Sequence, residues 1–235
     1  HFVARVPKGA PLPTVDVEAL ERDIVDATRT WDEDLVEAVR AEHGEEAGAR
    51  LSAKYVRAFP EAYKEDFAAR VAVTDLKRIE ALATPQSIEL NLYHEPGLAG
   101  EERRIKVYRH DPLSLTAVLP VFTHMGLEVT DERPYGLTRG GGAGVYIYDF
   151  GLRASSATVW GEGAEREPIR ARFQDAFSAV WRGDAESDGF NALVLEAGLT
   201  WRQVTVLRAL AKYLRQTQAT FSQDYVEQAL SANAG

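Results

Sequence analysis

The chain has 235 residues, of which 45% are hydrophobic and 27% are charged, a composition that favours a globular fold over disorder and allows one large core or two small ones. The formal net charge of −9 makes phosphate backbones and anionic lipid headgroups poor partners, and we expect neither nucleic acid nor membrane. The sequence contains no cysteine, which excludes disulfides, thiolate catalysis and cysteine-based zinc sites.

Targeting signals are missing from the sequence as given. No stretch approaches the roughly 18 apolar residues that a membrane-spanning helix requires, and the first residues lack the order of a signal peptide. We therefore expect a soluble, cytoplasmic protein. Apolar residues alternate along residues 1–6, as in a strand, but no partner strand precedes them. Residues 1–13 are therefore interpreted as the end strand of an upstream domain followed by a linker.

Residues 14–83 are predicted to form a helical segment. Asp16 can cap a long helix, because apolar residues then recur every three or four positions at Val17, Leu20, Ile24, Ala27, Trp31, Leu35 and Val39. This spacing predicts one continuous buried stripe, which Gly44 ends. Further helices are predicted at residues 51–59, 61–67 and 74–82.

In residues 84–165 the apolar period changes to two, which predicts strands. The predicted strands lie at residues 88–93, 105–109, 127–131 and 145–150. The first two should form a hairpin, and a helix capped by Ser114 and ended by Gly126 should separate the second strand from the third. The order is therefore strand, strand, helix, strand, strand.

Residues 166–235 return to the helical period and form the predicted C-terminal helical segment. Helices are expected from Pro168, from Thr200 and after Ser222, which can cap the last one. In the second of these helices, the pattern predicts a buried stripe at Val204, Leu207, Ala211 and Leu214 and a basic face at Arg208, Lys212 and Arg215. The whole chain is predicted to be α+β, with a small, mostly antiparallel sheet between helical segments.

The residue patterns that most often carry chemistry have simpler interpretations here. The glycine run at residues 140–144 joins two predicted strands and lacks a following Lys-Ser or Lys-Thr, so it favours a flexible hairpin over a phosphate loop. The five histidines share no metal-ligand spacing, and the acidic runs fall in loops or on polar helix faces. We predict no catalytic, cofactor-binding or metal-binding residue in this chain.

One candidate binding site remains, at the predicted helix that follows the second strand. The loop that contains Asp111 and Ser114 should place backbone amides at the helix N-terminus, beside the chain that leaves the helix at Gly126. Such amides can bind the carboxylate of an amino-acid effector. The alternative is that Ser114 simply caps the helix.

Several blocks of sequence carry a family resemblance when they are taken together. They are residues 30–35, 58–67, 118–127, 131–135, 149–152, 176–183, 188–191, 197–202, 211–216 and 220–225. In these blocks the chain resembles the large-subunit NAD-specific glutamate dehydrogenases of bacteria, in the region upstream of their catalytic domain. Residues 84–165 resemble an ACT domain, which has a ferredoxin-like fold, with one added leading strand.

The resemblance implies that the parent enzyme oxidises L-glutamate to 2-oxoglutarate and ammonia with NAD as its cofactor. This chain has no Pro-x-Gly-Gly-x-Lys motif and no Gly-x-Gly-x-x-Gly that opens a helix, so it is expected to bind no NAD itself. The expected partners are the catalytic domain of the same polypeptide, further copies in a homo-oligomer and an amino-acid effector. The alternatives are an amino-acid-binding regulatory module and an interaction protein, both without dehydrogenase activity.

Overall fold

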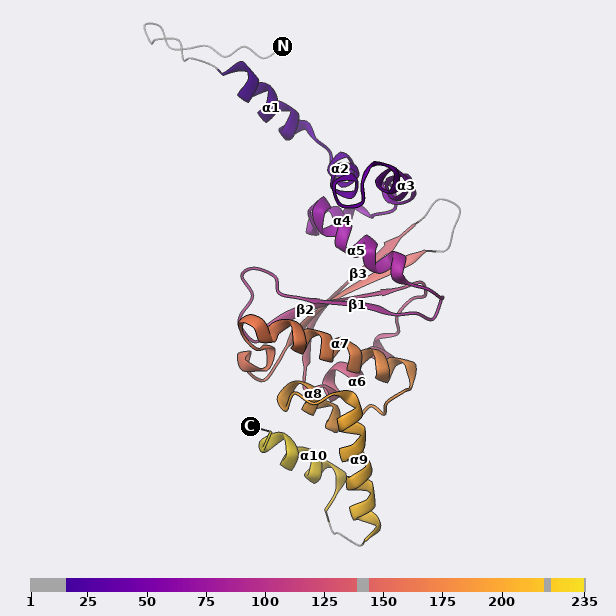
Figure 1. Ribbon diagram of the computed structural model, residues 1–235, viewed down its shortest axis with the longest axis vertical. Helices are drawn as coiled ribbons and strands as arrows, with labels where there is room; N and C mark the ends of the chain where they lie inside the picture. The colour runs from indigo at the N-terminus through magenta and orange to yellow at the C-terminus, as the bar shows by residue number, and fades with distance from the viewer. Residues whose placement is uncertain (1–15, 139–143, 218–220, 235) are drawn as a thin grey trace, which may run out of the picture.

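A four-stranded antiparallel sheet lies at the centre of the molecule, with helices on both faces (Figure 1). The computed structural model describes residues 16–138, 144–217 and 221–234. The strand proposed at residues 1–6 and most of the glycine run at residues 140–144 lie outside these residues. None of the helices in the described part of the chain combines the length and the apolar character that spanning a bilayer requires.

The sheet has the strand order β1-β2-β4-β3, so β1 and β3 are its edges. Its strands are β1 (Glu89–Tyr93), β2 (Glu102–Arg109), β3 (Glu128–Leu137) and β4 (Val145–Arg153). Each neighbouring pair is antiparallel, and helix α6 (Leu115–His124) connects β2 to β3. The prediction of an α+β fold with a mostly antiparallel sheet is confirmed, including the leading hairpin of β1 and β2 and the strand-strand-helix-strand-strand order.

One face of the sheet is apolar and packs on the helices of the second half of the chain. Alternate strand residues such as Leu92, Ile105 and Phe150 point to this face and are buried. They meet Phe122 of α6 and Phe177 of α7 (Arg166–Arg182). The ring centroids of Phe122 lie 5.3 Å from Phe150 and 5.1 Å from Phe177, so aromatic packing joins the sheet to both helices.

The opposite face of the sheet packs on the first half of the chain. This helical layer contains α2 (Trp31–His43), α3 (Glu45–Tyr55), α4 (Glu61–Asp66) and α5 (Ala69–Ala81). Its buried residues include Leu35, Tyr63 and Leu76, which share one core with Tyr108 and Ile147 of the sheet. The sheet is therefore the middle layer of three, as Figure 1 shows.

The predicted long helix from Asp16 to Val39 is wrong. The chain instead forms α1 (Val17–Thr28) and α2, because Thr30 caps α2: its hydroxyl accepts a hydrogen bond from the amide of Glu33, whose side chain accepts one from the amide of Thr30. Val17, Leu20 and Ile24 of α1 are 48–60% exposed, whereas Leu35 and Val39 of α2 are buried, so the predicted stripe is not continuously buried. Two other helices of this layer begin earlier than predicted: α3 begins at Glu45 and ends at Tyr55 rather than spanning residues 51–59, and α5 begins at Ala69 rather than at residue 74.

The C-terminal helices extend the molecule away from the sheet (Figure 1). After α7 come η3 (Gly189–Ala192), α8 (Leu193–Glu196), α9 (Trp201–Gln216) and α10 (Gln223–Ala232). The predicted cap of α10 by Ser222 is confirmed, since the Ser222 hydroxyl accepts a hydrogen bond from the amide of Tyr225. Two predictions for α9 are wrong: Leu214 is exposed, and Arg208 is buried because it lies one turn from Val204 and Ala211 on the buried stripe.

Arg208 joins three elements of this region. Its guanidinium donates two hydrogen bonds to the carboxylate of Asp188, at 2.7 and 2.8 Å, and a third to the side-chain oxygen of Asn191 at 2.6 Å. Gln223 of α10 also donates to Asp188. The charge of Arg208 is thus matched in the interior, and it ties α9 to the turn that precedes α8.

Candidate functional site

The three predicted effector-binding residues lie around helix α6 but not in one place. Ser114 is the N-cap residue of α6, yet its side chain caps no amide and instead pairs with the Thr116 hydroxyl at 2.8 Å. Asp111 is exposed in the turn before it. Gly126 follows the other end of α6 with φ of +78°, so roughly 15 Å of helix separates it from Ser114.

Gly126 lines an open groove between α6 and the edge strand β3. The groove has a volume of about 690 Å³ and includes Leu115, Leu119 and Val129 but neither Asp111 nor Ser114. Leu115 is 40% exposed, so apolar surface is available there. The groove can accept a side chain or another apolar segment, and only Gly126 of the three predicted residues contributes to it.

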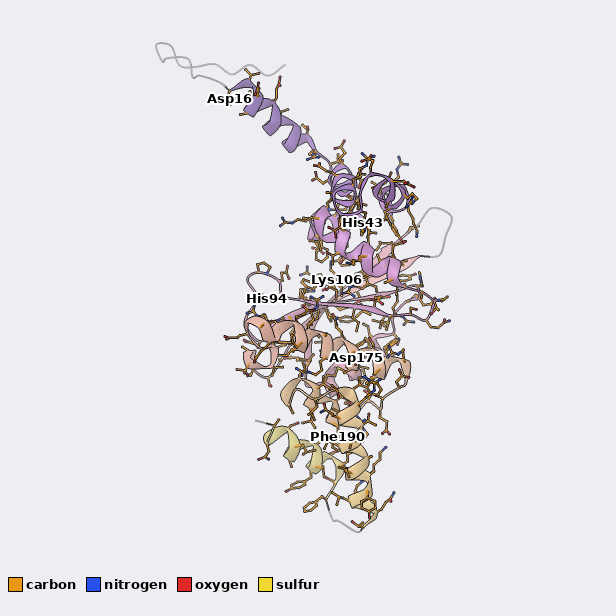
Figure 2. The ribbon with its side chains drawn as sticks, viewed as in Figure 1. Asp16, His43, His94, Lys106, Asp175 and Phe190 are labelled. Carbon is orange, nitrogen blue, oxygen red and sulfur yellow. The ribbon has the colours of Figure 1, made fainter. Side chains whose placement is uncertain are left out.

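A buried ion pair, absent from the sequence-based predictions, lies between the sheet and helix α5. The ammonium of Lys106 on β2 donates to the carboxylate of Asp75 on α5 at 2.6 Å, and the two residues are 1% and 0% exposed. The hydroxyls of Tyr108 and Tyr63 also donate to this carboxylate. Figure 2 shows Lys106 on the face of the sheet toward the helical layer.

Several contacts offset the desolvation of this pair. The Asp75 carboxylate accepts three hydrogen bonds, while the Lys106 ammonium also lies 3.6 Å from the centroid of the Phe67 ring. Burial and the negative charge of Asp75 raise the pKa of Tyr63 and of Tyr108, so both hydroxyls keep their protons and act as donors. The arrangement is a structural connection between two layers rather than a reactive centre.

A second buried carboxylate, Asp149 on β4, lies directly opposite Lys106 of β2 in the strand register, on the same face of the sheet. Its Oδ2 atom accepts hydrogen bonds at 3.0 Å from the hydroxyl of Tyr93 and from Nε of Arg104, while its Oδ1 atom has no partner among the described residues. Arg104 also donates to Asp131 at 2.8 Å. Asp149 and Arg104 therefore continue the charged row from the middle of the sheet to the edge strand β3.

Burial sets the protonation of this second group. Asp149 is wholly buried, and this raises the pKa of its carboxyl to about 6 although Arg104 and Lys106 act in the opposite direction. Burial would also raise the pKa of Asp131, but the hydrogen bonds and charge of Arg104 hold it below its usual value. The carboxyl of Asp149 therefore takes up its proton closer to neutral pH than a solvent-exposed aspartate does.

The sequence carried two signals for these residues that the predictions did not use. Asp75 lies on the apolar stripe of its helix, three residues after Ala72 and four before Ile79, where a charge requires a partner. Asp149 interrupts an aromatic strand in the same way. Among the described residues, no group of three metal-ligating side chains is present.

Three family models match consecutive parts of the chain. Helical motif 2 of glutamate dehydrogenase matches residues 38–82, the glutamate dehydrogenase ACT3 domain matches residues 87–164, and helical motif 3 matches residues 185–235. Together these matches cover most of the chain. The chain belongs to the glutamate dehydrogenase family. The resemblance inferred from the sequence blocks is thereby confirmed.

Three curated relatives of this family are each named NAD-specific glutamate dehydrogenase. The protein of Halomonas elongata is 36% identical over 93% of this chain, that of Pseudomonas aeruginosa 34% identical over 99%, and that of Mycobacterium tuberculosis 36% identical over 98%. The matches take in only 13%, 14% and 15% of the relatives' lengths. The chain thus corresponds to a small part of a glutamate dehydrogenase polypeptide.

The ACT3 match contains the whole sheet, because it begins two residues before β1 and ends after η1 (Ala157–Trp160). The helical motif 2 match begins within α2 and ends at Leu82, the residue that follows α5. The Asp75–Lys106 pair therefore joins helical motif 2 to the ACT3 domain of the glutamate dehydrogenase family.

Proposed function

We propose that this chain is a non-catalytic regulatory and assembly segment of a cytoplasmic NAD-dependent L-glutamate dehydrogenase. Oxidative deamination of glutamate to 2-oxoglutarate and ammonia, with NAD as cofactor, then belongs to another part of the same polypeptide. The proposal is supported by the names of the relatives and by the absence from this sequence of both the lysine-bearing glycine motif and the dinucleotide-binding motif. We assign its units as residues 1–13, 14–83, 84–165 and 166–235.

The observation that carries the assembly role is apolar surface at the two ends of the molecule. On α9, Val206, Leu210 and Tyr213 recur at helical spacing and are 55–62% exposed. On α1, Val17 and Ile24 are exposed in the same way. Contiguous apolar patches of this kind mark interaction surfaces, and we assign them to the remaining polypeptide and to further copies in a homo-oligomer.

The test of the non-catalytic role uses the purified chain with NAD and L-glutamate. We expect no glutamate-dependent rise in NADH absorbance and no heat of NAD binding. Glutamate-dependent NADH production by the pure chain would refute the proposal.

The assembly role is tested in the full-length enzyme by Leu210→Asp, which should weaken oligomerisation as measured by sedimentation. Arg215→Asp, at an exposed polar position of the same helix, should not.

A second candidate function is amino-acid sensing by the ACT-like module. The open groove between α6 and β3 favours it, because its lining combines the apolar residues Leu115, Leu119 and Val129 with Gly126. Calorimetry of the chain against each standard amino acid tests this function. Binding that Gly126→Val abolishes is expected, and an absence of heat at millimolar ligand would exclude it.

A further inference from the structure

A small pocket, which no sequence motif predicted, lies between the β1–β2 hairpin and the first turns of α7. It has a volume of about 160 Å³, and Leu92, Ile169 and Trp160 form its apolar part. Figure 2 shows His94, another of its lining residues, at the edge of the molecule on the side where α7 begins. The pocket is separate from the groove beside α6 and from the charged row in the sheet.

Arginine supplies the charge of this pocket in an otherwise acidic protein. Arg103, Arg166 and Arg170 all line it, and Glu167 is the single acidic lining residue. Glu167 is already bonded to Arg170, at 3.3 Å. Arg103 and Arg166 form no ion pair with any residue that the structure describes. Two positive charges at the pocket therefore lack an internal counterion.

The side chain of Arg103 is held in place without being neutralised. Its guanidinium donates to the backbone oxygens of Gly100 and Glu102, at 2.9 and 2.6 Å, and lies 5.5 Å from the centre of the Trp160 ring. Partial burial and the charge of Arg166 lower the pKa of Arg103, so the folded protein makes its positive charge less favourable. A bound anion would relieve this cost.

The third arginine also has spare hydrogen-bonding capacity. Arg170 donates to Glu167 and to the side-chain oxygen of Asn91 at 3.4 Å, but its buried Nε–H has no partner among the described residues. A guanidinium presents donors in a planar fork that matches a carboxylate or phosphate. The pocket thus combines three guanidinium groups with an apolar floor.

We propose that this pocket binds a small aliphatic dicarboxylate that carries no ammonium group. Two guanidinium groups without counterions match two carboxylates, and the apolar floor of Leu92 and Ile169 matches a short carbon chain. The volume is too small for a nucleotide. An α-amino acid is disfavoured because Glu167, the only acceptor of its kind in the lining, is already bonded to Arg170.

The proposal rests on this chain's own residues and stands or falls independently of the dehydrogenase assignment. It is tested by calorimetry of the chain at low ionic strength with succinate, glutarate, 2-oxoglutarate, L-glutamate and inorganic phosphate. We expect a dicarboxylate to bind more tightly than L-glutamate or phosphate, and its affinity to fall as salt is added. Arg103→Gln and Arg166→Gln should each weaken binding about tenfold or more, because each removes charged hydrogen bonds.

Arg215→Gln is the matched control, since this arginine is exposed on α9 outside the pocket, and it should bind like the unmodified chain. Arg166 is exposed as well, so its substitution tests the pocket without a risk to folding. No heat with any dicarboxylate, binding that both pocket variants retain, or equal affinity for L-glutamate or phosphate would overturn the proposal.

Discussion

The buried pair of Lys106 and Asp75 allows a quantitative test of what joins the helical layer to the sheet. Lys106→Met keeps the length of the side chain and removes its charge. The carboxylate of Asp75 then keeps only its two tyrosine donors in a site from which water is excluded. Breaking a buried pair in this way costs about 3–5 kcal/mol of folding free energy.

The double variant separates the cost of an orphaned charge from the cost of lost packing. Asp75→Asn alone leaves the ammonium of Lys106 buried and unpaired, so it should also cost about 3–5 kcal/mol. Asp75→Asn combined with Lys106→Met removes both charges of the pair, and replacement of a whole buried pair is often neutral or stabilising. We therefore expect the double variant to be more stable than either single variant.

The assay is urea unfolding of the four proteins at neutral pH, with midpoints compared in a double-mutant cycle. Lys54→Met is the control, because Lys54 also pairs with a carboxylate of α5, Glu80, at 2.7 Å but is 44% exposed. This control should change stability by less than about 1 kcal/mol. Equal losses at Lys54 and Lys106, or strictly additive single variants, would refute the reasoning.

Three further predictions concern other parts of the fold. Asp149→Asn should change how the free energy of unfolding depends on pH, because burial raises the pKa of Asp149 from 3.8 to about 6 and its stabilising contribution is therefore complete below pH 3.8 and lost as pH rises through 6. Across that range the unmodified chain should lose roughly 3 kcal/mol of stability relative to the variant, and parallel pH profiles of the two proteins would reject this. Gly151→Ala should lower the urea midpoint by an amount equivalent to about 1–3 kcal/mol, because its Cβ would lie 2.1 Å from the carboxylate of Asp131, whereas Gly136→Ala, with 3.7 Å to its nearest neighbour, should cost less than about 1 kcal/mol. Arg208→Met should lower the thermal midpoint through a loss of about 2–4 kcal/mol, because it leaves buried acceptors unpaired, and an unchanged midpoint would contradict the assigned role.

Local periodicity was sufficient to predict most of the elements. The alternation at Leu90 and Leu92 and the cap at Ser222 were both informative, because period and capping depend on residues close together in sequence. The break between α1 and α2 was missed although Thr30 and Glu33 have the spacing of a capping box. The apolar period continued across that boundary, and the local capping preference outweighed it.

The functional interpretation depended on the sequence blocks shared with the glutamate dehydrogenase family. The charged residues of the interior, in contrast, could not be paired from the sequence. Asp75 and Lys106 are separated by 31 positions, and Arg104 and Asp149 by 45. Their pairing depends on strand register and on which face the helical layer covers, and neither is encoded locally. The arginine pocket likewise combines residues of the β1–β2 hairpin with residues of α7.

One face of the sheet is apolar and the other carries buried charges, so the register of its strands cannot shift without a large loss of stability. Sliding β2 by one position would place Arg104 and Lys106 in the aromatic core beside Phe122 and expose Ile105 and Val107 to the carboxylates opposite. A single inserted or deleted codon within this strand should therefore abolish folding. The same change at residues 96–99 of the β1–β2 loop, most of which are exposed, should be tolerated, and homologues that differ in length are expected to differ there.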